Sequence, residues 1–173
     1  MRFKINEIGV DGVPVNVAVN SEWLAAACPD LDAHPGPAGL QLRGQISPTG
    51  DDYLLRADLR GELEMPCARC LEPARVRVDV PIVATYVAEG TEDVPEEDKD
   101  EAGLVTFTGN ELDLSEQVRD ELVLAIPFNP LCNEACKGLC PLCGGNRNLA
   151  ACGHATTAPA ATGGLAALAK IKL

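Results

Sequence analysis

Seven cysteines gather in two regions of this sequence, and thiolates are well suited to holding a soft metal ion. They are Cys67, Cys70, Cys132, Cys136, Cys140, Cys143 and Cys152. Two pairs have the spacing Cys-x-x-Cys, in which both sulfurs can reach one ion from a single turn. Tetrahedral zinc takes four such ligands, supplied by separate segments of a chain. The spacing therefore predicts a protein that holds one or two structural zinc ions.

Ligand counting leaves two ways of sharing these cysteines. With His154 they make eight ligands, enough for two four-coordinate sites. The partition that count and spacing favour gives one site Cys67, Cys70, Cys132 and Cys136, and the other Cys140, Cys143, Cys152 and His154. The alternative is a single site of Cys67, Cys70, Cys140 and Cys143, as in an ordinary zinc ribbon. The eighth cysteine, Cys28, is isolated beside Pro29 and is interpreted as a small core residue.

Catalytic chemistry fits the sequence less well. A thiol oxidoreductase carries its cysteine pair at a strand-to-helix turn of a βαβ unit, whereas extended segments flank Cys67 and Cys70. The sequence has no Gly-x-Ser-x-Gly and no phosphate-binding loop, and its two histidines lie in poor contexts. A catalytic zinc also keeps an open coordination position, while all-cysteine sites are closed. We therefore expect a protein that is not an enzyme and has no small-molecule substrate.

A long hairpin is expected to position the first cysteine pair. Apolar and polar residues alternate over 53–65, and the same period of two returns over 76–86, which is typical of half-buried strands. The cysteine pair lies between them and should form a knuckle at the hairpin tip. Weaker strands are expected over 13–19 and 40–46, with a turn at 49–52 leading into the hairpin. The pattern predicts an antiparallel sheet.

Two helices should accompany this sheet. Ser21 can cap a short helix over 22–27. Asp113 or Ser115 can cap a second helix, in which apolar residues recur at helical spacing from 118 to 126. The second helix should cover the sheet. The expected class is α+β: an antiparallel β-sheet covered by a helix, with a cysteine-rich zinc-binding segment on its C-terminal side.

The charge is concentrated in one stretch. Of the net charge of -12, residues 89–101 carry -7 from eight acidic residues and one lysine, which leaves -5 for the rest. Residues 89–103 contain a proline and no apolar period, so we expect a solvated acidic loop, followed by a short strand at 104–107. Acidic charge also opposes nonspecific attraction to nucleic acid, which needs lysine and arginine.

Three parts are expected along the chain. They are a sheet domain over 1–128 that includes the cysteine knuckle and the acidic loop, a cysteine-rich zinc-binding segment over 129–154, and a linker with a short amphipathic segment over 155–173. The longest apolar run, 122–128, is too short to cross a bilayer, and the first residues do not read as a signal peptide. We expect a cytoplasmic protein with no membrane partner, in a compartment where thiols stay reduced.

Several segments resemble one bacterial family. The knuckle Cys-Ala-Arg-Cys-Leu-Glu-Pro at 67–73, the helix end Leu-Ala-Ile-Pro at 124–127 and the run Cys-Lys-Gly-Leu-Cys-Pro-Leu-Cys-Gly-Gly-Asn at 136–146 are similar to the YceD-like family of large ribosomal RNA subunit accumulation proteins. The resemblance spans residues 40–173. It implies a role in promoting the synthesis or accumulation of large-subunit ribosomal RNA, hence in ribosome biogenesis, with no established enzymatic activity.

Either RNA or a protein fits the sequence as the partner. If the chain touches large-subunit ribosomal RNA directly, the candidates are the basic residues near the cysteines, namely Arg60, Arg69, Arg75, Arg77, Lys137 and Arg147. The alternative for these residues is an ordinary solvent-facing strand edge. A ribosomal protein or an assembly factor is an equally suitable partner. A generic zinc-stabilised protein-interaction module, and a thiol-redox or zinc-handling protein, are the other functions considered.

Overall fold

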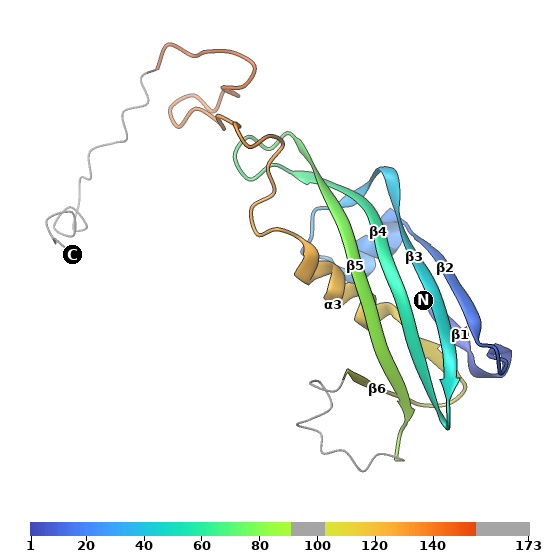
Figure 1. The fold of residues 1–173 in the computed structure, drawn as a ribbon. Coiled ribbons are helices and arrows are strands. Elements are labelled where there is room, and N and C mark those ends of the chain that lie inside the picture. Colours follow the sequence, from blue (N-terminus) through green and yellow to red (C-terminus); the bar gives the residue numbers. More distant parts are fainter. Residues whose placement is uncertain (91–102, 155–173) are drawn as a thin grey trace, which may run out of the picture.

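A sheet of five strands forms the centre of the molecule (Figure 1). The computed structural model describes residues 1–90 and 103–154. The strands, in their order across the sheet, are β2 (Val13–Val19), β3 (His34–Thr49), β4 (Asp52–Pro66), β5 (Pro73–Ala88) and β6 (Leu104–Phe107). A second, two-stranded sheet pairs β1 (Arg2–Lys4) with β7 (Glu111–Asp113), and a 3-10 helix, η1 (Ile5–Glu7), follows β1.

The predicted hairpin is confirmed, and its strands are longer than expected. β4 and β5 pair antiparallel from Tyr53 opposite Tyr86 to Pro66 opposite Pro73. From Leu55 to Met65 of β4, every second residue except Gly61 is buried, with Leu55, Leu59 and Leu63 fully so. This burial accounts for the period of two in the sequence, and it fixes the register that carries the hairpin out to its tip.

β3 also extends beyond the expected 40–46. It begins at His34, with a register shift between Pro35 and Leu40 where it passes β4. Gly61 of β4 lies opposite this shift with a φ of 149°, and a Cβ there would come within 2.1 Å of the Gly39 carbonyl oxygen. The prolines and glycines in this part of β3 hide the strand period, although the backbone still pairs.

The predicted antiparallel sheet is confirmed for its first four strands, and the fifth strand differs. β6 pairs parallel to β5, with Thr85 opposite Leu104 and Ala88 opposite Phe107. Parallel neighbours need a long connection, and the chain between these two strands is long enough to supply one. The acidic loop expected over 89–103 lies mostly outside the described residues, as does the linker and amphipathic segment expected over 155–173.

Two α-helices pack against the sheet, and their caps differ from the prediction. Asn20, and not Ser21, caps α1 (Ser21–Ala27), because its side-chain oxygen accepts the Trp23 N–H at 2.8 Å. α3 (Ser115–Ala125) begins after Leu114, which makes no side-chain cap, while the Asp113 carboxylate accepts the Ser115 N–H at 2.9 Å.

The helix expected to cover the sheet does so. Val118 and Leu122 of α3 are fully buried in the same core as Leu59 and Ile82. The hairpin tip extends beyond the part of the sheet that α3 covers, and there it meets the chain that follows α3 (Figure 1). Within the described residues, no helix has the length and apolar content needed to cross a membrane.

Candidate metal centres

A tight turn at the hairpin tip presents the first cysteine pair. The Cys67 N–H donates to the Glu72 carbonyl at 2.8 Å, and the Leu71 N–H donates to the Cys67 carbonyl at 2.9 Å. Leu71 adopts a left-handed φ of 64°, which no other described residue except glycine does. These bonds close the knuckle between β4 and β5, with Cys67 and Cys70 both buried.

The segment after α3 is fastened to this knuckle by polar contacts. The Ala68 N–H donates to the Pro130 carbonyl at 2.8 Å. The Arg69 guanidinium donates to the Cys136 carbonyl at 3.0 Å and to the Glu134 carbonyl at 3.5 Å. Cys132 and Cys136 are thereby brought to the hairpin tip, although they follow it by more than sixty residues.

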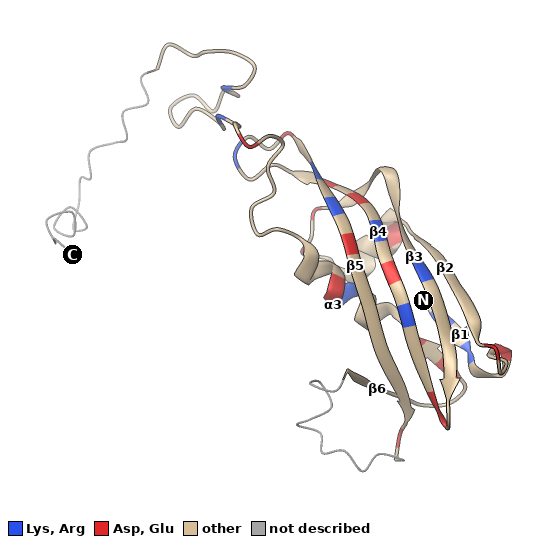
Figure 2. Cartoon of the chain, viewed as in Figure 1, with Lys and Arg blue, Asp and Glu red and all other residues tan. Residues whose placement is uncertain are grey.

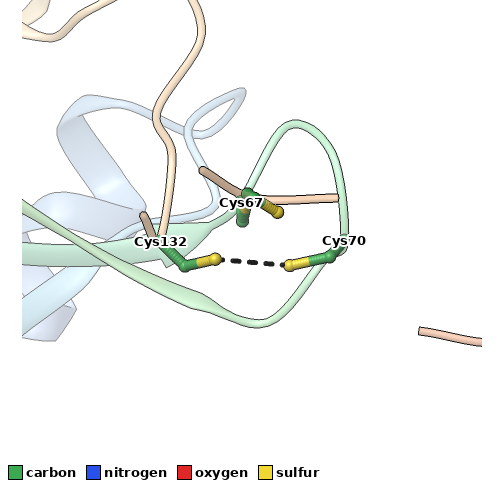
Figure 3. A group of neighbouring side chains, drawn as sticks. Cys67, Cys70 and Cys132 are labelled. Carbon is green, nitrogen blue, oxygen red and sulfur yellow. Dashed lines mark hydrogen bonds between the residues drawn. The ribbon is translucent and has the colours of Figure 1, made fainter. Parts of the chain in front are cut away.

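The four sulfurs form what we term the hairpin cluster: Cys67, Cys70, Cys132 and Cys136. Figure 3 shows three of these side chains converging, with 3.5 Å between the sulfurs of Cys70 and Cys132. The sulfurs of Cys67 and Cys136 lie 3.8 Å apart, and all four lie within 4.8 Å of one another. A tetrahedral ion with metal–sulfur bonds of about 2.3 Å needs sulfurs about 3.8 Å apart. The cluster therefore fits one four-coordinate metal ion.

A second group, termed the loop cluster, is formed by Cys140, Cys143, Cys152 and His154. The Cys140 sulfur lies 3.8 Å from Nδ1 of His154. The Gly144 N–H donates to the Cys140 carbonyl at 2.8 Å, in a turn where Gly144 has a φ of 70°. This cluster is more open than the first, because Cys143 is exposed and Cys152 is half-buried.

The two groupings are those that spacing and ligand count favoured. The four cysteines of the zinc-ribbon alternative are divided between the clusters, two in each, so the structure does not bring that set together. Cys28 belongs to neither group and is buried at the end of α1, as a core residue would be. Both clusters could hold a metal ion. That each of these side chains binds the metal stays a prediction.

The thiols within each cluster differ in their pKa values. Burial of the Cys67 thiol raises its pKa, but hydrogen bonds from neighbouring backbone groups outweigh this effect and lower the pKa to about 6. The largest of these contributions comes from the backbone of Cys132. The side-chain contact with Cys70 raises the pKa of Cys132 to about 12. In the loop cluster, backbone hydrogen bonds lower the pKa of Cys140 to about 6, and the bond from the backbone of Cys143 contributes most. Each cluster thus holds a thiol that ionises readily, and the thiolate is the form that binds metal.

Three of the basic candidates for RNA contact form ion pairs on the exposed face of the hairpin. Arg60 pairs with Asp79 at 2.9 Å, and Arg77 approaches the other oxygen of Asp79 at 3.9 Å. Arg75 lies 3.8 Å from the carboxylate of Glu62. Basic and acidic residues therefore lie close together on this face (Figure 2), whose positive charge is largely offset.

The other three basic candidates lie beside the cysteines. Arg69 holds backbone carbonyls, so its guanidinium is already engaged in joining the knuckle to the later segment. Lys137 is exposed and Arg147 half-buried, and neither side chain forms an ion pair with a described residue. Among the six candidates, Lys137 and Arg147 are thus the two whose side chains form neither an ion pair nor a hydrogen bond within the described chain.

Asn148 is a further residue of the site that sequence reasoning missed. Its Nδ2 donates to the Cys136 sulfur at 3.2 Å, and its Oδ1 accepts the Lys137 N–H at 2.8 Å. The hydrogen bond from Asn148 is the main reason why the pKa of Cys136 is lowered. Asparagine is common in turns, so only its place between Cys143 and Cys152 could have drawn attention to it.

Comparison with known proteins places the chain in a family. The family model described as large ribosomal RNA subunit accumulation protein YceD matches residues 55–172. Uncharacterized proteins of Mycobacterium tuberculosis and Mycobacterium bovis are each 41% identical over 107 residues, which is 61% of this chain and 50% of theirs. A Zea mays protein, named large ribosomal RNA subunit accumulation protein YCED homolog 1, chloroplastic, is 28% identical over 121 residues, 54% of this chain and 41% of that protein.

The matches cover different shares of the chain and of its relatives. The chain spans about half the length of the mycobacterial relatives it matches. No solved structure matches it. The family model, in contrast, covers well over half of the chain and includes the hairpin tip, α3 and both clusters. On this ground the chain belongs to the YceD family of large ribosomal RNA subunit accumulation proteins.

Proposed function

We propose that this chain promotes the synthesis or accumulation of large-subunit ribosomal RNA, and so acts in ribosome biogenesis, without catalysing a reaction. The observation that carries this proposal is the family match over residues 55–172, which contains every side chain of the two clusters. We assign its place of action to the cytoplasm, where ribosomal subunits of bacteria are assembled.

Zinc is the ion we propose for both clusters. The donor sets, four cysteines in one and three cysteines with a histidine in the other, are the usual ligands of structural zinc. Four protein ligands fill a tetrahedral ion, so neither site would keep a position for substrate or activated water, which supports a structural role. An ion in the hairpin cluster would tie the knuckle to the segment after α3.

The partner we propose is a protein of the assembling large subunit, bound by the cysteine-rich end. Leu71, Leu142 and Leu149, which lie in the turns around the two clusters, are 68%, 72% and 79% exposed. Exposed leucines at such turns suit an apolar contact with another protein. The hairpin arginines, by comparison, are already paired with carboxylates, which reduces their attraction to phosphate.

Profiling of ribosomal particles after deletion of the gene tests the proposed function. Sucrose gradients should show less large subunit relative to small subunit, restored by the wild-type gene. A variant with Cys67 and Cys70 both replaced by serine should fail to restore it, while Cys28→Ser should succeed. A normal large-subunit peak in the deletion strain would contradict the proposal and leave the generic interaction module as the better interpretation.

A further inference from the structure

One side chain joins the two clusters. Asn148 belongs to the loop between Cys143 and Cys152, two residues of the loop cluster, yet its amide nitrogen donates to the sulfur of Cys136 in the hairpin cluster. The same amide accepts the Lys137 N–H through Oδ1, and the Asn148 N–H donates to Oδ1 of Asn146. The two bonds of the side chain orient the amide toward the sulfur, and the backbone bond to Asn146 holds the turn that carries it.

The backbone around Asn148 is also shared by the clusters. Only three residues, Lys137 to Leu139, separate Cys136 from Cys140. The Leu139 N–H donates to the Arg69 carbonyl at 3.0 Å, and the Arg147 N–H donates to the Gly138 carbonyl at 3.0 Å. The loop that an ion in the loop cluster would close therefore lies directly against the knuckle of the hairpin cluster.

We propose that Asn148 couples the two metal sites, so that an ion in the loop cluster raises the affinity of the hairpin cluster for its own ion. This inference rests on the proposal that both clusters bind metal. Closing the loop between Cys143 and Cys152 restricts Asn148 to the position in which it donates to Cys136. A donor to a ligating thiolate offsets part of its negative charge and fixes its orientation.

The size of the effect follows from the kind of contact. Partners that hold a metal ligand by a hydrogen bond typically change metal affinity by 10- to 100-fold when they are removed. Coupling is reciprocal in equilibrium binding, so an ion in the hairpin cluster should raise the affinity of the loop cluster by the same factor. Loading of the two sites should therefore be cooperative.

Titration of the full chain with cobalt(II), in competition with a chelator, tests the coupling. The visible absorption of cobalt(II) differs between four-sulfur and three-sulfur, one-nitrogen coordination, so the two sites can be followed separately. Asn148→Ala should lower the affinity of the hairpin cluster about 10- to 100-fold while two ions still bind. Asn148→Asp, which keeps the acceptor for the Lys137 N–H and loses the donor, should lower it as well.

Two comparisons keep the result specific. Asn129→Ala replaces an exposed asparagine that bonds no described residue through its side chain, and it should leave both affinities unchanged. In a background of Cys152→Ser with His154→Ala, which empties the loop cluster, Asn148→Ala should have little further effect. An equal loss in both backgrounds, or none in either, overturns the coupling alone. Failure of the wild-type chain to bind cobalt(II) overturns both the coupling and the proposed metal sites.

Discussion

Replacing Cys67 by serine should destabilise the chain more than replacing Cys152. An ion in the hairpin cluster ties Cys70 to Cys132, 62 residues away, whereas an ion in the loop cluster ties Cys140 to His154, 14 residues away. The closure entropy rises as the logarithm of loop length, so the longer tie restricts the unfolded chain by about 1.3 kcal/mol more. For a chain of this size, that difference corresponds to about 3–5 °C in Tm.

Burial should widen this gap. Cys67 is fully buried in a small core of its own with Ala74 and Cys136, while Cys152 is half-buried. A serine hydroxyl in the hairpin cluster would remove a metal ligand at a place where water does not reach, and the remaining thiols would repel one another once ionised.

Thermal unfolding followed by circular dichroism at saturating zinc provides the assay. Cys28→Ser is the matched control, because Cys28 is buried, as Cys67 is, and belongs to neither cluster. It should leave the zinc content unchanged, whereas Cys67→Ser should lose about one ion. Equal loss of Tm in Cys67→Ser and Cys152→Ser would refute the assignment of the longer tie to the hairpin cluster.

Three further predictions follow from the geometry. Metal binding should release protons at pH 7 and weaken as pH falls, because the pKa values of Cys70 and Cys132 are raised and these thiols must ionise to bind. A metal affinity that stays constant from pH 6 to 8 would contradict this. Gly61→Ala should lower the free energy of unfolding, measured in urea, by about 2 kcal/mol or more, since the added Cβ would meet the Gly39 carbonyl oxygen at 2.1 Å. An unchanged free energy of unfolding would disprove the close approach. Leu142→Ser combined with Leu149→Ser should keep both zinc ions and fail to restore large subunits in the deletion strain, whereas full restoration would argue against an apolar partner contact.

Much of the fold could be predicted because the hairpin buries one face along its whole length. The alternation over 53–65 and 76–86 records the burial of residues such as Leu59 and Ile82, and a slip of one residue in the pairing would turn these side chains to solvent. The direction of β6 could not be predicted, because four residues carry no signal of which neighbour they join. The first part of β3 was missed because its prolines and glycines hide the period.

The cysteine groups were predictable for a different reason. Ligand types and spacings are set by the coordination geometry of a metal, so they are visible in the sequence before any fold is known. The roles of Arg69 and Asn148 were not predictable, because a guanidinium or an amide that bonds a carbonyl or a sulfur leaves no periodic trace. Arg69 was one candidate for direct RNA contact, and the structure places its guanidinium on the backbone of the neighbouring segment.

Elemental analysis of protein purified without chelator tests the central claim most directly. The two clusters, with four ligands each, predict close to two zinc ions per chain, and Cys67→Ser and Cys152→Ser should each retain about one. A value near one in the wild-type chain would remove the loop cluster as a metal site, and iron in place of zinc would correct the identity of the ion. A value near zero with all thiols reduced and titratable would contradict the claim that these cysteines are metal ligands.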